Sequence, residues 1–243
     1  MNTDFNCKLF DIDKFHLLES QADYENIFSR RANEDVELLS RLGICRFVSL
    51  VDHDERYSVA ATLNLIKRRK QMVDQILTLE NKRRARIDFY PRVRLYAHAP
   101  YINDIHRLAV NGTNYLFLLC PDPVVDASDL DLALNKILYS CKLVPIFSDF
   151  NTWVNLFDKS FIDRLLNIKG AAFQFSTNAT PTPESFELIK KILKSNNMVI
   201  FGTSSHHYDL NINMISKNIS TLRNKLGDAV YFDMRIRSHR FLR

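Results

Sequence analysis

Seven short apolar runs, separated by longer stretches with helical periodicity, constrain the fold of this chain more than any other feature. Because a parallel strand pair needs a long crossover, usually a helix, this alternation favours parallel pairing. Seven such units in 243 residues predict a single domain over residues 1–243, a distorted (β/α)7 barrel similar to a TIM barrel. The expected strands are Leu9–Ile12, Cys45–Val51, Val93–Ala97, Tyr115–Leu119, Leu143–Phe147, Ala171–Phe175 and Met198–Phe201.

Capping signals and apolar spacing locate helices between these runs. Ser58 opens a long helix to about Leu79, and Thr182-Pro183-Glu184 combines an N-cap threonine with a first-turn proline and glutamate. Glycines then close several helices, as residues just past a helix end often do. Further helices are expected at Asp129–Ser140, Phe157–Ile168 and Met214–Leu226.

The composition excludes several classes of protein. Apolar residues make up 46% of the chain, yet no run of about 18 occurs, so we expect no membrane span. The polar stretch Met1–Lys8 lacks the apolar segment of a signal peptide, which favours a cytoplasmic protein. Neither a dinucleotide fingerprint nor a P-loop is present among only five glycines.

The net charge is +5, and the positive charge is unevenly distributed over two basic clusters. In the first, Lys67–Lys70 and Lys82–Arg86 flank a helical stretch, and Arg92 and Arg94 follow; the second is the basic end, residues 234–243. We interpret the first as a solvated helix face and the second as a flexible tail. Binding of phosphate, nucleic acid or an anionic membrane surface is the alternative.

Polar residues follow the apolar runs, where barrel enzymes keep their chemistry. We therefore expect function to be carried by side chains at these strand ends. They include Asp13, Asp52, His53, His98, Cys120, Ser148, Asp149, Ser176, Ser205, His206 and His207.

Several segments resemble the PHP (polymerase and histidinol phosphatase) superfamily, in order and pattern over nearly the whole chain. The resemblance is closest to the bacterial capsule-biosynthesis tyrosine phosphatases, which are manganese-dependent distorted (β/α)7 barrels that act on a tyrosine kinase controlling polysaccharide export. The similar segments are Phe10–Phe15 (family I-D-x-H-x-H), Phe47–His53 (V-S-T-S-H), Leu134–Leu138 with Leu143–Ile146 (A-L-x-K-I-L and T-P-V-I), Phe173–Ser176 (Q-V-N) and Val199–Thr203 (V-I-A-S-D).

The metal-ligand positions of that family are largely lost. Its first two histidines fall on Asp13 and Phe15, and its bridging glutamate falls on His98. Its fifth-strand histidine falls on Ser148, and its last on Ser205 or His206. Manganese prefers carboxylate and imidazole ligands, so this loss predicts a pseudoenzyme that retains the fold and binds no metal cofactor.

The alternative to complete loss of the metal site is a remodelled one, built from other side chains. Manganese or zinc would then be held by His53, His98, Asp149 and His206, with Asp13 at the same barrel mouth. Arg56, in the polar loop after the second run, is a further candidate because a guanidinium binds phosphate or carboxylate bidentately. A surface ion pair is the competing interpretation of Arg56.

These interpretations lead to three candidate functions. The first is a pseudoenzyme of capsule or exopolysaccharide biosynthesis that binds a protein partner, a tyrosine kinase or the export machinery, or a phosphorylated ligand. The second is an active metal-dependent phosphoesterase with the remodelled site. The third is an RNA-associated protein, since a protein subunit of ribonuclease P is also a metal-free PHP-like barrel. It ranks last, and we do not expect a nucleic-acid partner, because no RNA-reading module is visible. The oligomeric state is left open.

Overall fold

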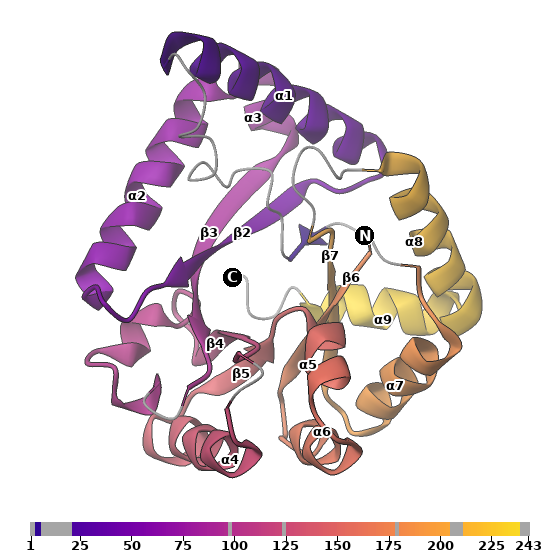
Figure 1. Cartoon of the computed structure of the whole chain (residues 1–243). Helices are drawn as coiled ribbons and strands as arrows, with labels where there is room; N and C mark the ends of the chain where they lie inside the picture. The colour runs from indigo at the N-terminus through magenta and orange to yellow at the C-terminus, as the bar shows by residue number, and fades with distance from the viewer. Residues whose placement is uncertain are drawn as a thin grey trace.

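The strands of the computed structural model form one parallel sheet in chain order, and the model describes residues 3–5, 21–96, 99–122, 125–177, 180–204 and 211–238. A 3.0 Å hydrogen bond from the Phe5 N–H to the Phe201 carbonyl joins the two edges of the sheet. The result is a nearly closed barrel inside a ring of helices (Figure 1), which confirms the predicted fold class. The strands are β1 (Thr3–Asp4), β2 (Arg46–His53), β3 (Arg86–Arg94), β4 (Tyr115–Leu119), β5 (Val144–Phe147), β6 (Ala172–Ser176) and β7 (Met198–Gly202).

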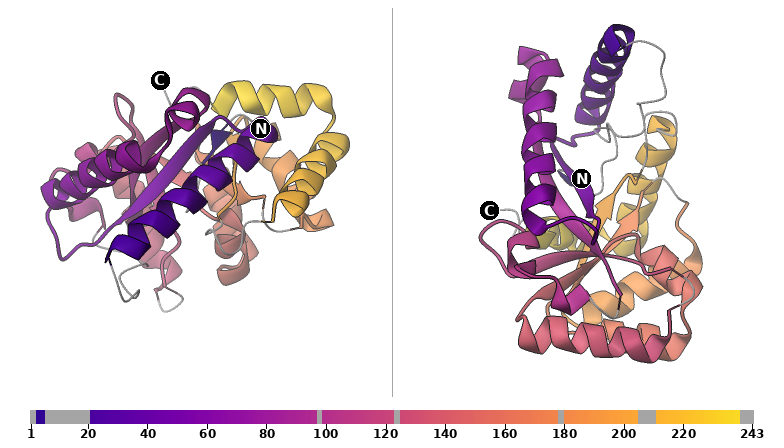
Figure 2. Two further views of the ribbon diagram at one scale, coloured as in Figure 1. Left: turned by 90° about the horizontal axis from the view of Figure 1, so that it is seen from above. Right: turned by 60° about the vertical axis from the view of Figure 1, so that its left-hand side comes forward.

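Helices cover the outside of the barrel. In Figure 2, α1 lies along α2, and α8 lies beside α9. The predicted caps are confirmed, since the hydroxyls of Ser58 and Thr182 accept the backbone N–H groups of Ala61 and Ser185. The helices are α1 (Gln21–Arg41), α2 (Val59–Ile76), α3 (Leu79–Arg84), η2 (Ala99–Tyr101), η3 (Ile105–Leu108), α4 (Ala127–Asn135), the π-helix η4 (Lys136–Ser140), α5 (Phe150–Leu156), α6 (Lys159–Leu166), α7 (Pro183–Lys194), α8 (Ile212–Leu226) and α9 (Asp228–Ser238).

Two separate apolar layers hold the barrel together. Most of the core lies between the strands and the surrounding helices, because alternate strand residues point outward. The strand residues between them point inward and form most of a smaller apolar cluster inside the barrel. It comprises Phe5, Val48, Tyr90, Val110, Phe117, Ile146, Ala172, Met198 and Ile200.

Two strand predictions differ from the structure. The strand expected at Val93–Ala97 is wrong, because β3 spans Arg86–Arg94 and alternates charged or polar residues with apolar ones. The run Leu9–Ile12 lies outside the described residues, and the first strand of the sheet is Thr3–Asp4 instead. The position of β3 matters for function, because it brings Arg92 into the barrel.

The basic end of the chain is helical as far as the structure describes it. Helix α9 runs to Ser238 and contacts β7, and both Met234 and Ser238 are buried. The prediction of a flexible tail over residues 234–243 is therefore wrong for 234–238, because Met234 packs into the core. Residues 239–243 lie outside the described part.

None of the described helices combines the length and the apolar character needed to cross a bilayer.

Candidate functional site

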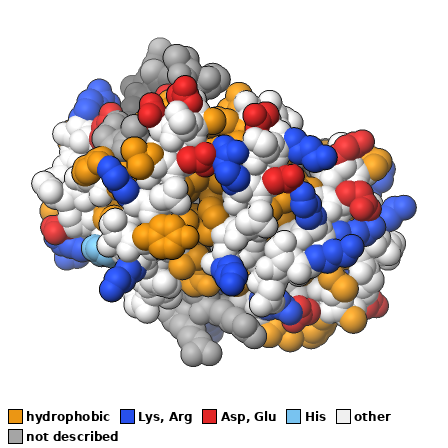
Figure 3. All heavy atoms as spheres, turned by 90° about the horizontal axis from the view of Figure 1, so that it is seen from below, with side chains coloured by type: hydrophobic (Ala, Val, Ile, Leu, Met, Phe, Trp, Pro, Cys, Tyr) orange, Lys and Arg blue, Asp and Glu red, His pale blue; other side chains and the backbone are white. Residues whose placement is uncertain are grey.

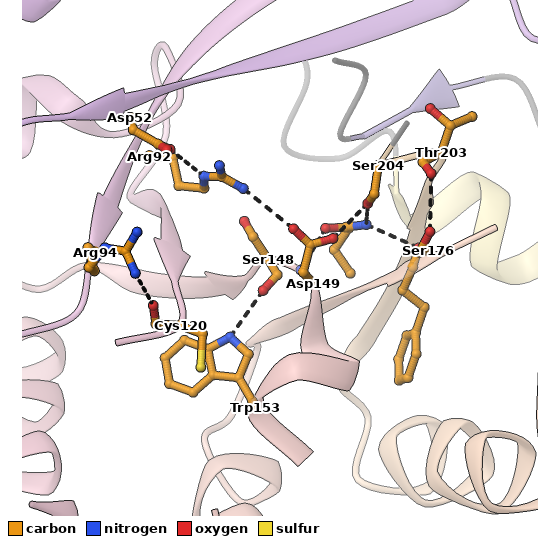
Figure 4. Close-up of polar contacts among 12 residues, drawn as sticks. Asp52, Arg92, Arg94, Cys120, Ser148, Asp149, Trp153, Ser176, Thr203 and Ser204 are labelled. Atoms are coloured by element: carbon orange, nitrogen blue, oxygen red, sulfur yellow. Dashed lines mark hydrogen bonds and ion pairs between the residues drawn. The ribbon is translucent and has the colours of Figure 1, made fainter. Parts of the chain in front are cut away.

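A buried arginine lies at the centre of the barrel mouth. Arg92 Nε donates a 2.7 Å hydrogen bond to Asp52 Oδ1, and Arg92 Nη1 lies 3.6 Å from Asp149 Oδ2. Figure 4 shows the guanidinium reaching between the two carboxylates, which come from β2 and from the end of β5. The Arg92 side chain is only 8% exposed. One cation is thus shared by two carboxylates.

Strand register explains why these residues meet. Asp52 pairs in register with Arg92 on the neighbouring strand, so the two side chains share a face of the sheet. That face is the barrel interior, because Val48 and Tyr90, which precede them by even numbers of residues, belong to the interior cluster. Asp52 and Arg92, near the carboxyl ends of their strands, therefore lie above the apolar cluster inside the barrel.

Asp149 and Ser204 close the other side of the mouth. The Ser204 hydroxyl donates a 2.6 Å hydrogen bond to Asp149 Oδ1, and the Asp149 N–H donates to Gln174 Oε1 at 2.8 Å. Both residues have left-handed backbones, with φ of 50° and 52°. Such conformations are costly for residues other than glycine and concentrate at functional sites. Each residue is the second one past the end of a strand, on the side of the barrel where a ligand would meet it.

Buried polar atoms at the mouth retain hydrogen-bonding capacity. Within the described part of the chain, Arg92 Nη1 and the hydroxyl of Ser148 have no hydrogen-bond partner. The Ser148 carbonyl, in contrast, accepts a 3.0 Å bond from the indole of the fully buried Trp153, which fixes the turn after β5. The mouth can therefore donate further hydrogen bonds to a polar ligand.

His53 faces away from this cluster. Its Nδ1 lies 2.8 Å from the hydroxyl of Thr62 on α2, and the residue is 8% exposed. Burial lowers the pKa of His53, although Asp54 and Glu55 act in the opposite direction. The imidazole is therefore neutral at pH 7 and belongs to the outer layer of the barrel.

Arg56 lies at the surface rather than in the barrel. Its Nε donates to the Asp54 carboxylate at 2.9 Å, and its side chain is 80% exposed. This contact lowers the pKa of Asp54 to about 2. Arg56 therefore forms a surface ion pair with Asp54, which was the competing interpretation of this residue.

The remaining candidate residues divide into two groups. Asp13, His98 and His206 lie outside the described residues, whereas His53 and Asp149 are described and contact different partners. Among the described side chains, no group of three or more His, Cys, Asp or Glu residues is arranged to hold a metal ion.

Cys120, which follows β4, is not an activated nucleophile. Burial raises its pKa to about 12, so the thiol stays protonated at neutral pH.

The principal residue missed by sequence reasoning is Arg92. The signal was the alternation Asp88, Tyr90, Arg92, Arg94, which places polar residues on one face of a strand. It was read instead as part of a basic cluster.

Two of the cavities lined by described residues differ in their relation to the mouth. One of about 260 Å³ lies where β2 and β3 end, next to Asp52 and His53. The other, about 1,150 Å³, is an outer groove among α5, α6 and α7. Two of its lysines form ion pairs, Lys191 with Asp163 and Lys190 with Glu187. Figure 3, seen from the side of α4 and α6, shows charged side chains of both signs around apolar ones. Of these two, the smaller cavity is the one lined by a residue of the mouth, Asp52.

Comparison with known protein families finds no match, and no curated protein matches the sequence. One similar solved structure is phospho-2-dehydro-3-deoxyheptonate aldolase (DAHP synthase) from Thermotoga maritima. The TM-score is 0.41 at 11% sequence identity, over 94% of this chain and 68% of that one.

Proposed function

We propose that this chain is a PHP-like pseudoenzyme that binds a ligand at its barrel mouth without a metal cofactor. The observation that supports this is the position of the Arg92 guanidinium between Asp52 and Asp149. A guanidinium is permanently charged in proteins. Arg92 therefore provides at the mouth the positive charge that a bound metal ion would otherwise contribute.

The chemistry of a guanidinium differs from that of a metal pair. Two metal ions accelerate phosphoester hydrolysis by clamping the attacking and leaving oxygens and by lowering the pKa of a bound water. Arg92 is held by two carboxylates and offers only N–H donors, so it can neither coordinate a water molecule nor lower its pKa as a metal ion does. Cys120 supplies no alternative nucleophile, since its pKa is raised to about 12. These features favour binding over hydrolysis.

The resemblance to the capsule-biosynthesis phosphatases supplies the biological part of the proposal. We place the protein in the cytoplasm, where it binds a tyrosine kinase or a component of the polysaccharide-export machinery. Affinity purification from the native host followed by mass spectrometry tests this part. Enrichment of such a partner supports it, and a purification without one contradicts it.

Metal content and turnover test the biochemical part. We expect protein purified without chelators to contain well under one equivalent of manganese or zinc by elemental analysis. We also expect no hydrolysis of p-nitrophenyl phosphate above the rate of the buffer containing Mn²⁺. Stoichiometric metal together with metal-dependent turnover would establish the active phosphoesterase instead.

A further inference from the structure

Two buried polar atoms at the barrel mouth have no hydrogen-bond partner among the described residues. They are Arg92 Nη1 and the hydroxyl oxygen of Ser148. Ser148 is completely buried, and the Arg92 side chain is 8% exposed. Nearly all buried polar groups in proteins are hydrogen-bonded, so an exception calls for a partner supplied from elsewhere. Two exceptions at one mouth indicate a position for a bound polar group.

Ser148 and Arg92 point into the same part of the barrel. Ser148 continues β5, because its N–H donates a 2.8 Å hydrogen bond to the Leu118 carbonyl on β4. Its side chain therefore points inward, like that of Ile146 in the interior cluster. Figure 4 shows the Ser148 hydroxyl directed toward the Arg92 guanidinium. Asp149 Oδ2 lies 3.6 Å from Arg92 Nη1, which is too far for a hydrogen bond.

A group that fills this position must both accept and donate hydrogen bonds. The guanidinium of Arg92 offers only donors, whereas the ionised carboxylate of Asp149 only accepts. A hydroxyl meets both demands with one oxygen atom, and the Ser148 hydroxyl can bond to it in either direction. A fully ionised phosphate or carboxylate can only accept, and an ammonium can only donate. The hydrogen-bonding pattern therefore favours a hydroxyl.

The charges at the mouth favour an uncharged ligand. Two carboxylates, Asp52 and Asp149, face the single guanidinium of Arg92. Arg94, two residues further along β3, is paired with Asp122. An anion between the two carboxylates would meet more repulsion than attraction, and a cation would meet the guanidinium. A hydroxyl adds no net charge and leaves the existing ion pairs intact.

The mouth offers contacts to more than one hydroxyl. Asp52 is 56% exposed and borders the cavity of about 260 Å³. On the opposite side, the Ser204 hydroxyl donates a 2.6 Å hydrogen bond to Asp149 Oδ1. Acceptors and donors thus follow one another from β2 to the end of β7. The cavity is slightly smaller than the roughly 300–1,000 Å³ of pockets for drug-sized ligands, so the ligand is small.

We infer that the barrel mouth binds an uncharged polyhydroxyl compound of monosaccharide size. One of its hydroxyls lies between Arg92, Ser148 and Asp149, where it accepts from the guanidinium and donates to the carboxylate. The inference rests on the proposed binding function and names the ligand class of the same site. A phosphorylated ligand is disfavoured there by Asp52 and Asp149.

Titration with matched sugars tests the ligand class. The probes are glucose, galactose, mannose and N-acetylglucosamine, each followed by saturation-transfer difference NMR up to tens of millimolar. We expect at least one to bind, and we expect its 6-phosphate and its 2-amino analogue to bind at least about tenfold more weakly. If none of the four binds, the position holds water only and the inference is overturned. Equal or tighter binding of the charged analogues overturns it as well.

Ser148→Ala locates the site without disturbing the fold. Because the hydroxyl has no partner among the described residues, its removal should leave Tm unchanged or raise it. Affinity for the sugar that binds should fall about threefold to tenfold, the loss of one hydrogen bond. The matched control is Ser40→Ala on α1, which removes another buried hydroxyl without a described partner and should leave affinity unchanged. Full affinity in Ser148→Ala, whatever its Tm, would exclude this position.

Asp149→Asn tests the preference for an uncharged ligand. Asparagine tolerates the left-handed backbone of this position and retains an acceptor oxygen. Removal of one negative charge should reduce the discrimination against the 6-phosphate about tenfold. An unchanged ratio of the two affinities would mean that the carboxylates of the mouth do not select the ligand.

The same preparation separates this inference from the proposed function. Metal-free, inactive protein that binds none of the sugars retains the pseudoenzyme proposal and rejects the polyhydroxyl site. Stoichiometric metal with turnover rejects the pseudoenzyme, whatever the titration gives.

Discussion

Arg92 Nε lies 2.7 Å from Asp52 Oδ1, although the residues are 40 positions apart in the chain. Parallel register between β2 and β3 produces this contact, and the Arg92 side chain is almost completely shielded from solvent. Asp149 approaches the same guanidinium from the end of β5. The arginine therefore links three strands at the mouth, and its removal tests both the stability and the charge balance of the site.

Arg92→Gln should lower the free energy of unfolding by about 1–3 kcal/mol, because two neighbouring carboxylates lose their shared cation. The matched control is Arg94→Gln. Arg94 lies two residues further along β3, but it is 37% exposed and pairs with the exposed Asp122, so its loss should cost about 0–1 kcal/mol. Urea unfolding of both variants measures the difference. Equal losses would mean that Arg92 does not organise the mouth.

Manganese should stabilise the Arg92→Gln variant but not the wild type. Removal of the guanidinium leaves the Asp52 and Asp149 carboxylates facing one another, which is a weak site for a divalent cation. A ligand that binds only the folded state raises Tm. Thermal unfolding with and without millimolar Mn²⁺ measures the shift, with Arg94→Gln as the unresponsive control. A similar shift in the wild type would contradict the role assigned to Arg92.

Backbone strain at Ser204 is separable from its hydrogen bond to Asp149. Ser204→Ala and Ser204→Gly both remove the hydroxyl, but only glycine adopts a φ of 52° without cost. The left-handed region costs other residues about 1–2 kcal/mol, so the glycine variant should be about 1 kcal/mol more stable than the alanine variant. Chemical denaturation of the pair measures this directly. An alanine variant as stable as the glycine variant would show that the loop relaxes.

Buried parallel strands were the part of this fold that sequence could predict. Four expected strands, from Tyr115–Leu119 to Met198–Phe201, lie within one residue of β4 to β7. Such strands are covered on both faces and read as continuous apolar runs.

The residues of the mouth were harder to predict, because the elements that carry them lack such continuous apolar runs. β3 contains Arg92, Arg94 and Pro91 between its apolar residues and carries Arg92 into the interior, so it lacks an apolar run. β1 has only two residues, too few for any periodicity. Helix α5 follows Asp149, an N-cap residue with a left-handed backbone whose side chain forms no capping hydrogen bond, so this start does not follow the usual capping pattern. Asp149 itself was identified from its position after a strand, whereas its contacts with Arg92 and Ser204 depend on the three-dimensional register.

Stability should decline as the pH falls below 6.5 because of His53. Burial lowers its pKa in the folded protein, so below 6.5 the unfolded chain takes up a proton that the folded chain does not. The stabilisation is complete above 6.5 and is lost progressively as the pH falls toward the lowered pKa. Asp54 acts in a separate window, between 3.8 and about 2. Urea unfolding at pH 7.5, 6.5 and 5.5 should show a decline that His53→Asn reduces, and identical slopes would exclude His53 as its source.

Thiol labelling should distinguish Cys45 from Cys120. Cys45 is exposed, whereas Cys120 is buried and has its pKa raised to about 12. Alkylation requires an accessible thiolate, so native protein at pH 8 should be labelled by iodoacetamide at Cys45 within minutes and at Cys120 only after denaturation. Peptide mapping by mass spectrometry gives the order of modification, with protein denatured in urea as the control for complete labelling. Rapid native labelling of Cys120 would show that the end of β4 opens to solvent and that this thiol can react in the folded protein.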